Sequence, residues 1–254
     1  DRMDGEGRMT QADGSVFDGV FAAGQRVGKG KLTQADGGVY VGDWQSGKRS
    51  GQGTLTYPDG WKYDGQWVAG LMEGQGTLNH PEGWSYVGEW KGGRINGYGT
   101  FYFADGRVYA GEWADGQLSG HGEFLAPSQW KYVGEWKASQ PDGHGKLAHA
   151  DGWTFIGQWK AGQRVGDGTL SYVDGWEYTG SWKNGKPAGT GRLKQPDGST
   201  FAGLFEDGKQ TGEGTVTHPD GRKITGVWKN GELDGQGEIA IPGQYTYSGG
   251  WKAG

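Results

Sequence analysis

Short runs of alternating apolar and polar residues return every 23 residues along this chain. Residues 61–67 read Trp-Lys-Tyr-Asp-Gly-Gln-Trp, and residues 74–80 read Gly-Gln-Gly-Thr-Leu-Asn-His. A period of two is typical of a β-strand with one apolar and one polar face. Because each unit holds two such runs, the pattern predicts about 22 short strands, and a fixed period of this length indicates a repeat array.

Two positions of the unit carry most of its aromatic residues when the unit is numbered from its first aromatic. The first position reads Phe17, Tyr40, Tyr63, Tyr86, Tyr109, Tyr132, Phe155, Tyr178, Phe201, Ile224 and Tyr247. The fifth position reads Phe21, Trp44, Trp67, Trp90, Trp113, Trp136, Trp159, Trp182, Phe205, Trp228 and Trp251. The third, twelfth and fourteenth positions are glycine in every unit, and the sixteenth is always apolar. Glycines that keep phase in this way indicate an ordered repeat rather than a disordered segment.

The links between the runs have the chemistry of tight turns. Residues 183–186 read Lys-Asn-Gly-Lys and residues 58–60 read Pro-Asp-Gly; proline pre-sets φ and glycine supplies a positive φ. We therefore expect an all-β fold, an elongated single-layer antiparallel β-meander built from 23-residue β-hairpin repeats. Residues 1–254 form one array, with partial units at 1–16 and 247–254 and ten full units at 17–246. Because both ends fall inside a unit, we expect a fragment of a longer array.

The pattern also predicts which residues face one another in a hairpin. If the turn spans the sixth to eleventh positions, the fifth position lies opposite the twelfth, the third opposite the fourteenth and the first opposite the sixteenth. Trp67 is then expected over Gly74, and Tyr63 against Leu78. The glycines leave room for the aromatic rings, so a valine at Gly97 is expected to strike Trp90.

Composition excludes several classes of partner. The formal net charge is −5 and the 25 basic residues are dispersed, so no electrostatic footprint for nucleic acid exists. Anionic membranes are disfavoured for the same reason. The chain has no cysteine, which removes disulfides and thiolate metal sites. We expect no cofactor.

The order of glycine and aromatic positions resembles the MORN repeat. Residues 86–99 read Tyr-Val-Gly-Glu-Trp-Lys-Gly-Gly-Arg-Ile-Asn-Gly-Tyr-Gly, and the likeness covers the whole chain. The resemblance implies an extended antiparallel sheet with an aromatic-lined groove. It also implies scaffolding, self-association and partner binding, together with a debated role in phospholipid binding. Departures cluster at residues 127–142, where Ser139-Gln140-Pro141 replaces a glycine turn; a tolerant turn or an altered groove explains them.

No constellation of residues indicates catalysis, so we expect no enzyme. His80, His149 and His218 lie three units apart, and His121 and His144 lack the third ligand that zinc requires. The Asp-Gly pairs are explained by aspartates that bond their own turn. The Gly-x-Gly pairs lack the helix that a phosphate loop needs.

The tryptophans at the twenty-second position are the best candidates for partner binding. They are Trp61, Trp84, Trp130, Trp153 and Trp176, whereas other units carry Ser15, Gly38, Arg107, Ser199 or Arg222 there. The predicted register places the first four opposite His80, Phe103, His149 and Tyr172, and Tyr57 belongs to the same row. Because the repeat does not need these rings, we expect a groove that holds a partner polypeptide. A phospholipid-surface adaptor and a glycan-binding module are the alternatives.

Open strand edges predict self-association. The last strand carries Tyr245, Tyr247 and Trp251, and we expect a homodimer through this C-terminal edge. We expect a cytoplasmic protein, or one held at a membrane or the cytoskeleton by its partner.

Overall fold

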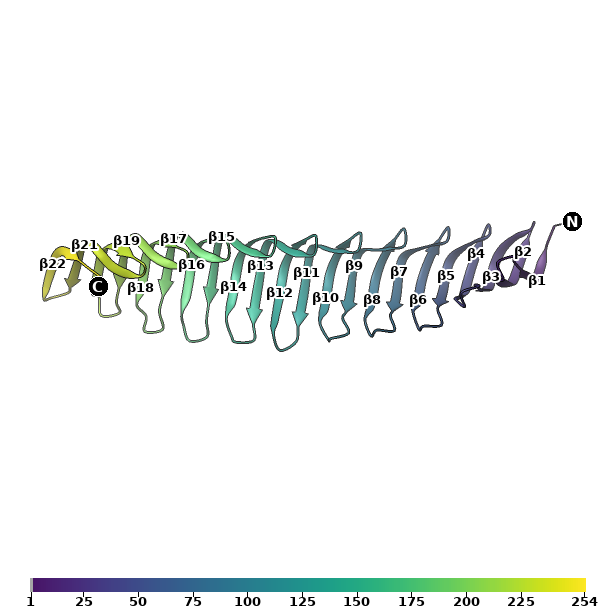
Figure 1. Ribbon diagram of the computed structural model, residues 1–254, viewed down its shortest axis with the longest axis horizontal. Helices are drawn as coiled ribbons and strands as arrows, with labels where there is room; N and C mark the ends of the chain where they lie inside the picture. Colours follow the sequence, from purple (N-terminus) through teal and green to yellow (C-terminus); the bar gives the residue numbers. More distant parts are fainter. Residues whose placement is uncertain (1) are drawn as a thin grey trace. The chain divides into compact units, whose positions relative to one another are not determined.

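A computed structural model describes residues 2–254, which form 22 β-strands in two compact units that meet at Ala126 and Pro127 (Figure 1). The first unit contains β1 (Gly5–Thr10), β2 (Val16–Ala22), β3 (Gln25–Thr33), β4 (Val39–Gln45), β5 (Lys48–Thr56), β6 (Lys62–Val68), β7 (Leu71–Asn79), β8 (Ser85–Lys91), β9 (Arg94–Tyr102), β10 (Val108–Ala114) and β11 (Gln117–Ala126). The second contains β12 (Trp130–Lys137), β13 (Gln140–His149), β14 (Thr154–Lys160), β15 (Gln163–Ser171), β16 (Glu177–Lys183), β17 (Lys186–Lys194), β18 (Thr200–Glu206), β19 (Lys209–Thr217), β20 (Lys223–Lys229), β21 (Glu232–Ile241) and β22 (Tyr245–Trp251). Within each unit every strand pairs antiparallel with the next one along the chain. No helix occurs among residues 2–254, and the predicted all-β meander of hairpins is confirmed.

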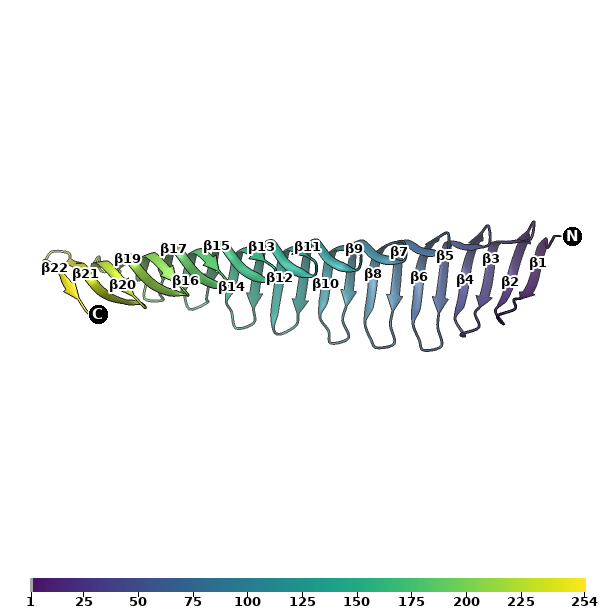
Figure 2. The same ribbon diagram turned by 45° about the horizontal axis from the view of Figure 1, so that its top comes forward.

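Two kinds of turn alternate along the chain. Within each compact unit, one kind lies at one end of the strands and the other kind at the opposite end (Figure 2). The short turn between β6 and β7 has Ala69 at φ 51° and Gly70 at φ 94°, as a two-residue type I′ turn requires. The amide of Gly70 also donates to the carbonyl of Arg49 at 2.8 Å, which ties this hairpin to the preceding one. In the longer turn Trp61 donates its amide to the Asp59 carboxylate at 3.0 Å. The aspartates of the Pro-Asp-Gly turns therefore serve the backbone, as their spacing predicts.

The predicted pairings of the first and third positions are confirmed, but the predicted pairing of the fifth position is wrong. Tyr63 pairs with Leu78 and Gly65 with Gly76, as expected. Trp67, however, pairs with Met72 at the tenth position rather than with Gly74. The chain reverses in two residues instead of six, and a bulge on β7 absorbs the difference. Gly74 pairs instead with Trp90 of the next hairpin.

The fourth position of the unit closes this bulge. Gly74 at the bulge has φ +66°, which only glycine adopts readily. The amide that follows, that of Gln75, donates to Oε1 of Gln66 at 3.0 Å. Glu112 and Asp43 accept the equivalent amides in their own hairpins. Because bulges bend a strand, each bulge contributes to the curvature seen along the strands (Figure 1).

The prediction that a valine at Gly97 would strike Trp90 is therefore wrong. A Cβ atom there would meet the side chain of Glu89, not the ring of Trp90. Gly97 also has φ +71°, so any side chain at this bulge position is strained whatever the space around it.

The aromatic rings of the first and fifth positions form the core on one face of the sheet. Tyr63 is 0% exposed and Trp67 is 3% exposed, although only one layer of sheet is present. The ring of Tyr63 lies over the glycine pair at the third and fourteenth positions, since a Cβ on Gly76 would come within 2.6 Å of two atoms of that ring. Its hydroxyl donates to the carbonyl of Gln66 at 3.0 Å. The glycines thus let the sheet bury its own aromatic face.

Rings of successive hairpins interlock along each unit. Tyr63 meets Trp67 edge to face at 5.2 Å and Trp90 of the next hairpin also at 5.2 Å. Edge-to-face pairs at this separation add roughly 0.5–1.5 kcal/mol beyond the area they bury. The indole of Trp67 also donates to the carbonyl of Gly53 in the preceding hairpin at 2.9 Å. The β6–β7 hairpin is therefore joined to its neighbours by backbone pairing, by rings and by an indole hydrogen bond.

Gly76→Ala tests the dependence of the fold on the glycine pair. The added methyl overlaps the Tyr63 ring, and overpacking of this kind costs about 1–3 kcal/mol. Gly7→Ala is the matched control, because Gly7 holds the same position in β1 but its Cβ would only touch Phe21 at 3.6 Å. Urea denaturation is expected to show a loss for the first variant and little change for the second. Equal losses in the two variants contradict the packing described above.

Buried tyrosines predict a loss of stability in alkali. Burial raises the pKa of Tyr40 and of Tyr178 from 10.0 to about 12. Below pH 10 both the folded and the unfolded states keep these protons, so stability is unaffected. Between pH 10 and 12 the unfolded state ionises first, and the free energy of unfolding falls.

The measurement compares urea denaturation of the parent chain and of a Tyr40→Phe, Tyr178→Phe double variant from pH 8 upward. Phenylalanine is tolerated at the first position, as Phe17 and Phe155 show. The parent should lose stability more steeply above pH 10, the ordinary pKa of tyrosine. Parallel profiles for the two proteins rule out the tyrosines as the cause.

Candidate functional site

Six positions of the repeat share the inner face, meaning the face that carries the core rings. One pocket in the second unit collects a residue from each of them, and its volume is about 170 Å³. The first, fifth and sixteenth positions contribute core residues, whereas the tenth, eighteenth and twenty-second positions lie around them. The pocket is lined by Trp130, Tyr132, Pro141, Leu147, His149 and Trp159.

The pocket lies at the sequence irregularity of residues 127–142. Pro141 occupies the tenth position, where Arg164 stands one repeat later. Proline is shorter than arginine, so less of the neighbouring Trp159 is covered. Trp130 and His149 pair across β12 and β13, as the predicted register requires. The irregular unit therefore carries an apolar hollow on the inner face.

The tryptophans of the twenty-second position are half-buried rather than part of the closed core. Some of these tryptophans contact the ring four residues earlier, across the turn that precedes them. In the first unit Trp61 meets Tyr57 at 5.4 Å and Trp84 stacks on His80 at 4.4 Å. Trp84 also stacks on Phe101 at 5.2 Å.

The same arrangement recurs in the second unit. Trp153 stacks on His149 at 4.9 Å, and Trp176 meets Tyr172 at 5.3 Å. Phe103 of the first unit differs, because its ring packs on Phe101 and Phe124. The structure therefore divides the predicted binding residues between the two units, with Trp61, Trp84, Tyr57, His80 and Phe103 in the first and Trp130, Trp153, Trp176, His149 and Tyr172 in the second.

Three arginines at the tenth position complete the inner face, and the sequence reading missed them. The guanidinium of Arg26 lies 4.5 Å from the ring of Trp44. That of Arg49 lies 4.5 Å from the ring of Trp67. Arg164 lies 4.8 Å from the ring of Trp182. Cation–π contacts of this kind are favourable, more so when the cation is partly desolvated. Burial lowers the pKa of all three guanidinium groups below the usual value.

Charge is distributed unevenly between the two faces. None of the six inner positions carries an aspartate or a glutamate in any repeat, although the chain has 30 acidic residues. Acidic residues stand instead at the turns and on the outer face, as Asp43 does where it pairs with Lys29 at 2.7 Å. The inner face is therefore cationic and aromatic in an acidic protein.

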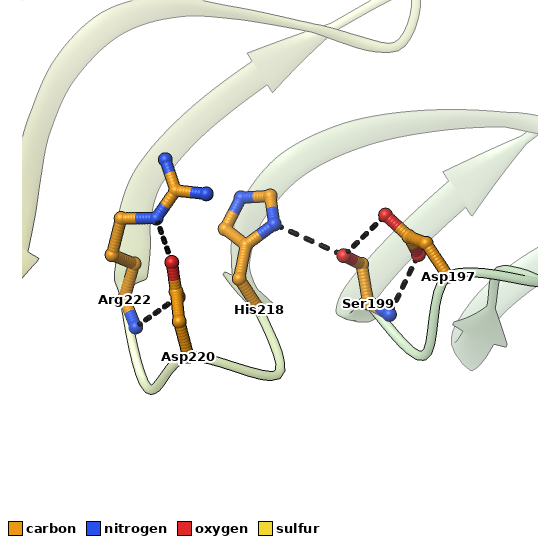
Figure 3. Close-up of polar contacts among 5 residues, drawn as sticks. All are labelled: Asp197, Ser199, His218, Asp220 and Arg222. Carbon is orange, nitrogen blue, oxygen red and sulfur yellow. Dashed lines mark hydrogen bonds and ion pairs between the residues drawn. The ribbon is translucent and has the colours of Figure 1, made fainter.

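Ser199 and His218, at the twenty-second and eighteenth positions of successive repeats, belong to the polar cluster of Figure 3. Ser199 Oγ lies 3.0 Å from His218 Nδ1 and donates to the Asp197 carboxylate at 2.9 Å. Because the hydroxyl proton goes to Asp197, the histidine must donate to Ser199, which is the reverse of a nucleophile activated by a base. Ser199 is also only 3% exposed. The cluster fills the space of a missing tryptophan.

Arg222 lies in the same view and is held by its own turn. Its Nε donates to Asp220 at 2.6 Å, in the way that Arg107 Nε donates to Asp105 at 2.7 Å (Figure 3). Arginines at the twenty-second position are thus neutralised locally.

Within residues 2–254 no three histidine, cysteine or acidic side chains converge to hold a metal ion. The amides of His121 and His144 donate to Glu112 and Glu135, respectively, at the bulges. None of the described residues forms a helix that could cross a bilayer.

The predicted self-association residues lie on β22. Tyr245 is 56% exposed and Tyr247 is 49% exposed, whereas first-position tyrosines such as Tyr63 are fully buried. Trp251 meets Tyr247 edge to face at 5.7 Å. In the part of the chain that the structure describes, β22 pairs on one side, with β21.

Comparison with known proteins identifies the repeat. A family model described as MORN repeat matches eleven consecutive segments, residues 1–16, 17–39, 40–62, 63–85, 86–106, 109–131, 132–154, 155–177, 178–200, 201–221 and 225–240. No curated protein matches the chain.

Two solved structures resemble the chain weakly. One is the SAS-4 (dCPAP) TCP domain of Drosophila melanogaster in complex with a proline-rich motif of Ana2 (dSTIL), with 13% identity, 61% of this chain and 87% of that chain covered, and a TM-score of 0.39. The other is the wild-type TCP10 domain of Danio rerio CPAP in complex with a peptide of Danio rerio STIL, with 16% identity, 98% and 99% covered, and a TM-score of 0.29. Both TM-scores are below 0.5, so neither structure bears on the site.

Proposed function

This chain belongs to the MORN-repeat family, and we propose that it is a non-catalytic scaffold whose inner face holds a partner polypeptide. The family match supports a protein-binding scaffold in general terms.

The observation that carries the proposal is the surplus of tryptophan. Ser15 and Ser199 stand at the same position as Trp61 and Trp84, are 5% and 3% exposed, and sit in repeats with intact strands. The repeat therefore closes its core without a ring there. Large aromatic rings that the fold does not need, left half-exposed on one face, are typical of anchoring residues at protein interfaces.

Two other occupants of this face fit less well. A glycan needs an open ring face for stacking, but Trp84 already stacks on His80 and Phe101. An anionic membrane is repelled by the formal charge of −5 and by the acidic residues at the turns. A polypeptide can use both the apolar hollow beside Pro141 and the ring edges.

Replacing Trp84, Trp153 and Trp176 by serine together tests the proposal. Serine occurs naturally at this position, so the circular dichroism spectrum and the unfolding transition should persist. Capture of peptides selected from a random display library against the parent chain should weaken by at least about tenfold, because aromatic anchors at interfaces are each worth about 2 kcal/mol or more.

The control is Tyr98→Ser, which removes an aromatic ring that is 59% exposed on the opposite face. Its affinity for the selected peptides should equal that of the parent. Unchanged capture by the triple variant, or collapse of its fold, shows that the tryptophans are structural. Recovery of anionic vesicles in place of peptides favours the lipid alternative.

A second proposal concerns the C-terminal strand. The exposed Tyr245 and Tyr247 lie on a strand that pairs only with β21 among the described residues, which supports a two-fold dimer through β22. A dimer of this kind would cover both tyrosine rings.

Light scattering at increasing concentration measures this association directly. We expect the mass to approach twice that of the chain, and a proline at Thr246 to restore the monomer because proline lacks the amide that an edge strand donates. A mass that stays monomeric at every concentration excludes the dimer.

A further inference from the structure

We propose that Arg26 and Arg49 form a subsite for the carboxylates of an acidic partner segment, and that the partner of the first unit is therefore an acidic polypeptide with aromatic or apolar side chains. This inference rests on the proposed function and adds the chemical class of the partner. Both arginines lie in the first unit, on β3 and β5, at the same position of successive hairpins.

Neither guanidinium has a partner of its own. Within residues 2–254 Arg26 and Arg49 make no hydrogen bond and no ion pair through their side chains, and Nη1 of Arg49 is buried without an acceptor. A buried donor left without a partner is destabilising, more so when it is charged. A carboxylate from outside the chain would remove this cost.

Some other cations of the chain pair with its own carboxylates, whereas Arg26 and Arg49 do not. Arg107 is bonded to Asp105 in its own turn, and Lys29 to Asp43 on the outer face. No acidic residue occupies an inner position that could serve Arg26 or Arg49. The cationic pair is therefore built into a face from which the chain excludes its own carboxylates.

The charge of Arg49 reaches Arg26. The pKa of Arg26 is lowered first by burial and then by the charge of Arg49. Two like charges on one face repel each other, and both attract an anion. Successive hairpins are about 10 Å apart, twice the strand spacing, so carboxylates at that separation can engage the pair together.

Aromatic residues flank the pair and complete the subsite. The guanidinium of Arg49 lies 5.6 Å from the ring of Tyr40, and on the same face the rings of Tyr57 and Trp61 meet at 5.4 Å. Carboxylates on the arginines would thus lie beside the row of half-buried rings. An acidic segment with interspersed apolar residues fits this order of charge and ring, whereas a basic segment would be repelled.

The second unit contains a single arginine, Arg164, in a similar aromatic environment at the tenth position. Arg164 lies 5.4 Å from Phe155 and 6.0 Å from Trp153, and it makes no ion pair among the described residues. The recurrence shows that the association of an unpaired arginine with the surplus rings is not an accident of one hairpin.

The test uses parallel selections from one random peptide display library, against the parent chain and against an Arg26→Gln, Arg49→Gln double variant. Gln210 occupies the tenth position naturally, so the variant should keep its fold. Peptides selected on the parent should be enriched in aspartate and glutamate together with apolar residues. Peptides selected on the variant should keep the apolar residues and lose the acidic enrichment.

One selected peptide and its Glu→Gln form are then measured by fluorescence polarisation. The Glu→Gln change in the peptide and the double arginine variant of the chain should each weaken binding by about tenfold or more. Combining them should weaken binding little further than either change alone, as expected for groups that contact each other. Arg94→Gln is the matched control, because Arg94 is an exposed arginine paired with Asp115. It should bind like the parent.

The outcomes separate the two proposals. Capture of peptides without acidic enrichment, or with additive losses, overturns the carboxylate subsite and leaves the scaffold in place. Failure to capture any peptide overturns both. Arginine-dependent sedimentation with phosphatidylserine vesicles, in the absence of peptide capture, replaces the polypeptide with a lipid headgroup and also overturns the inference.

Discussion

The fold depends on the contact between an aromatic ring at the first position and the glycine pair at the third and fourteenth positions. Tyr63 over Gly65 and Gly76 shows why no other residue fits. A Cβ on Gly76 would overlap the tyrosine ring, and one on Gly65 would overlap the Gly76 backbone and the tyrosine hydroxyl. A single layer of sheet normally leaves one apolar face in water. Here the ring lies flat on bare backbone and is covered by the tryptophans of two hairpins, so one layer suffices.

Because rings packed on glycines close the core, the same face can carry both the core residues and the residues proposed to bind a partner. Once the first and fifth positions are closed, the rings of the twenty-second position and the arginines of the tenth remain as the accessible part of the inner face. They vary from repeat to repeat, with serine, glycine or arginine in place of tryptophan and proline or methionine in place of arginine. The invariant positions hold the repeat together, and the variable positions are free to select a partner.

The sequence predicts most of the fold because the period of two and the 23-residue repeat leave little choice. It does not predict the bulge, since the alternation of residues such as Glu73, Gly74 and Gln75 reads as an unbroken strand. The positive φ of Gly74, which only the structure shows, marks the bulge at which the twelfth position no longer pairs within its own hairpin. Because the bulge shifts the tenth position opposite the fifth, Arg26 and Arg49 move onto the inner face, where the predicted register did not place them. The sequence does predict the tryptophans of the twenty-second position as binding candidates, because other repeats carry serine, glycine or arginine there.

The most direct test of the division between core and binding rings is the ¹H–¹⁵N spectrum of the indole groups during titration with a peptide captured by the parent chain. Trp67 donates its indole proton to Gly53 inside the core, whereas Trp61 and Trp84 lie outside it. We predict that the indole signals of Trp61 and Trp84 shift with peptide while those of Trp67 and Trp90 stay in place. Shifts confined to Trp67 and Trp90 would contradict the assignment, because the partner would then enter the core that the glycines close.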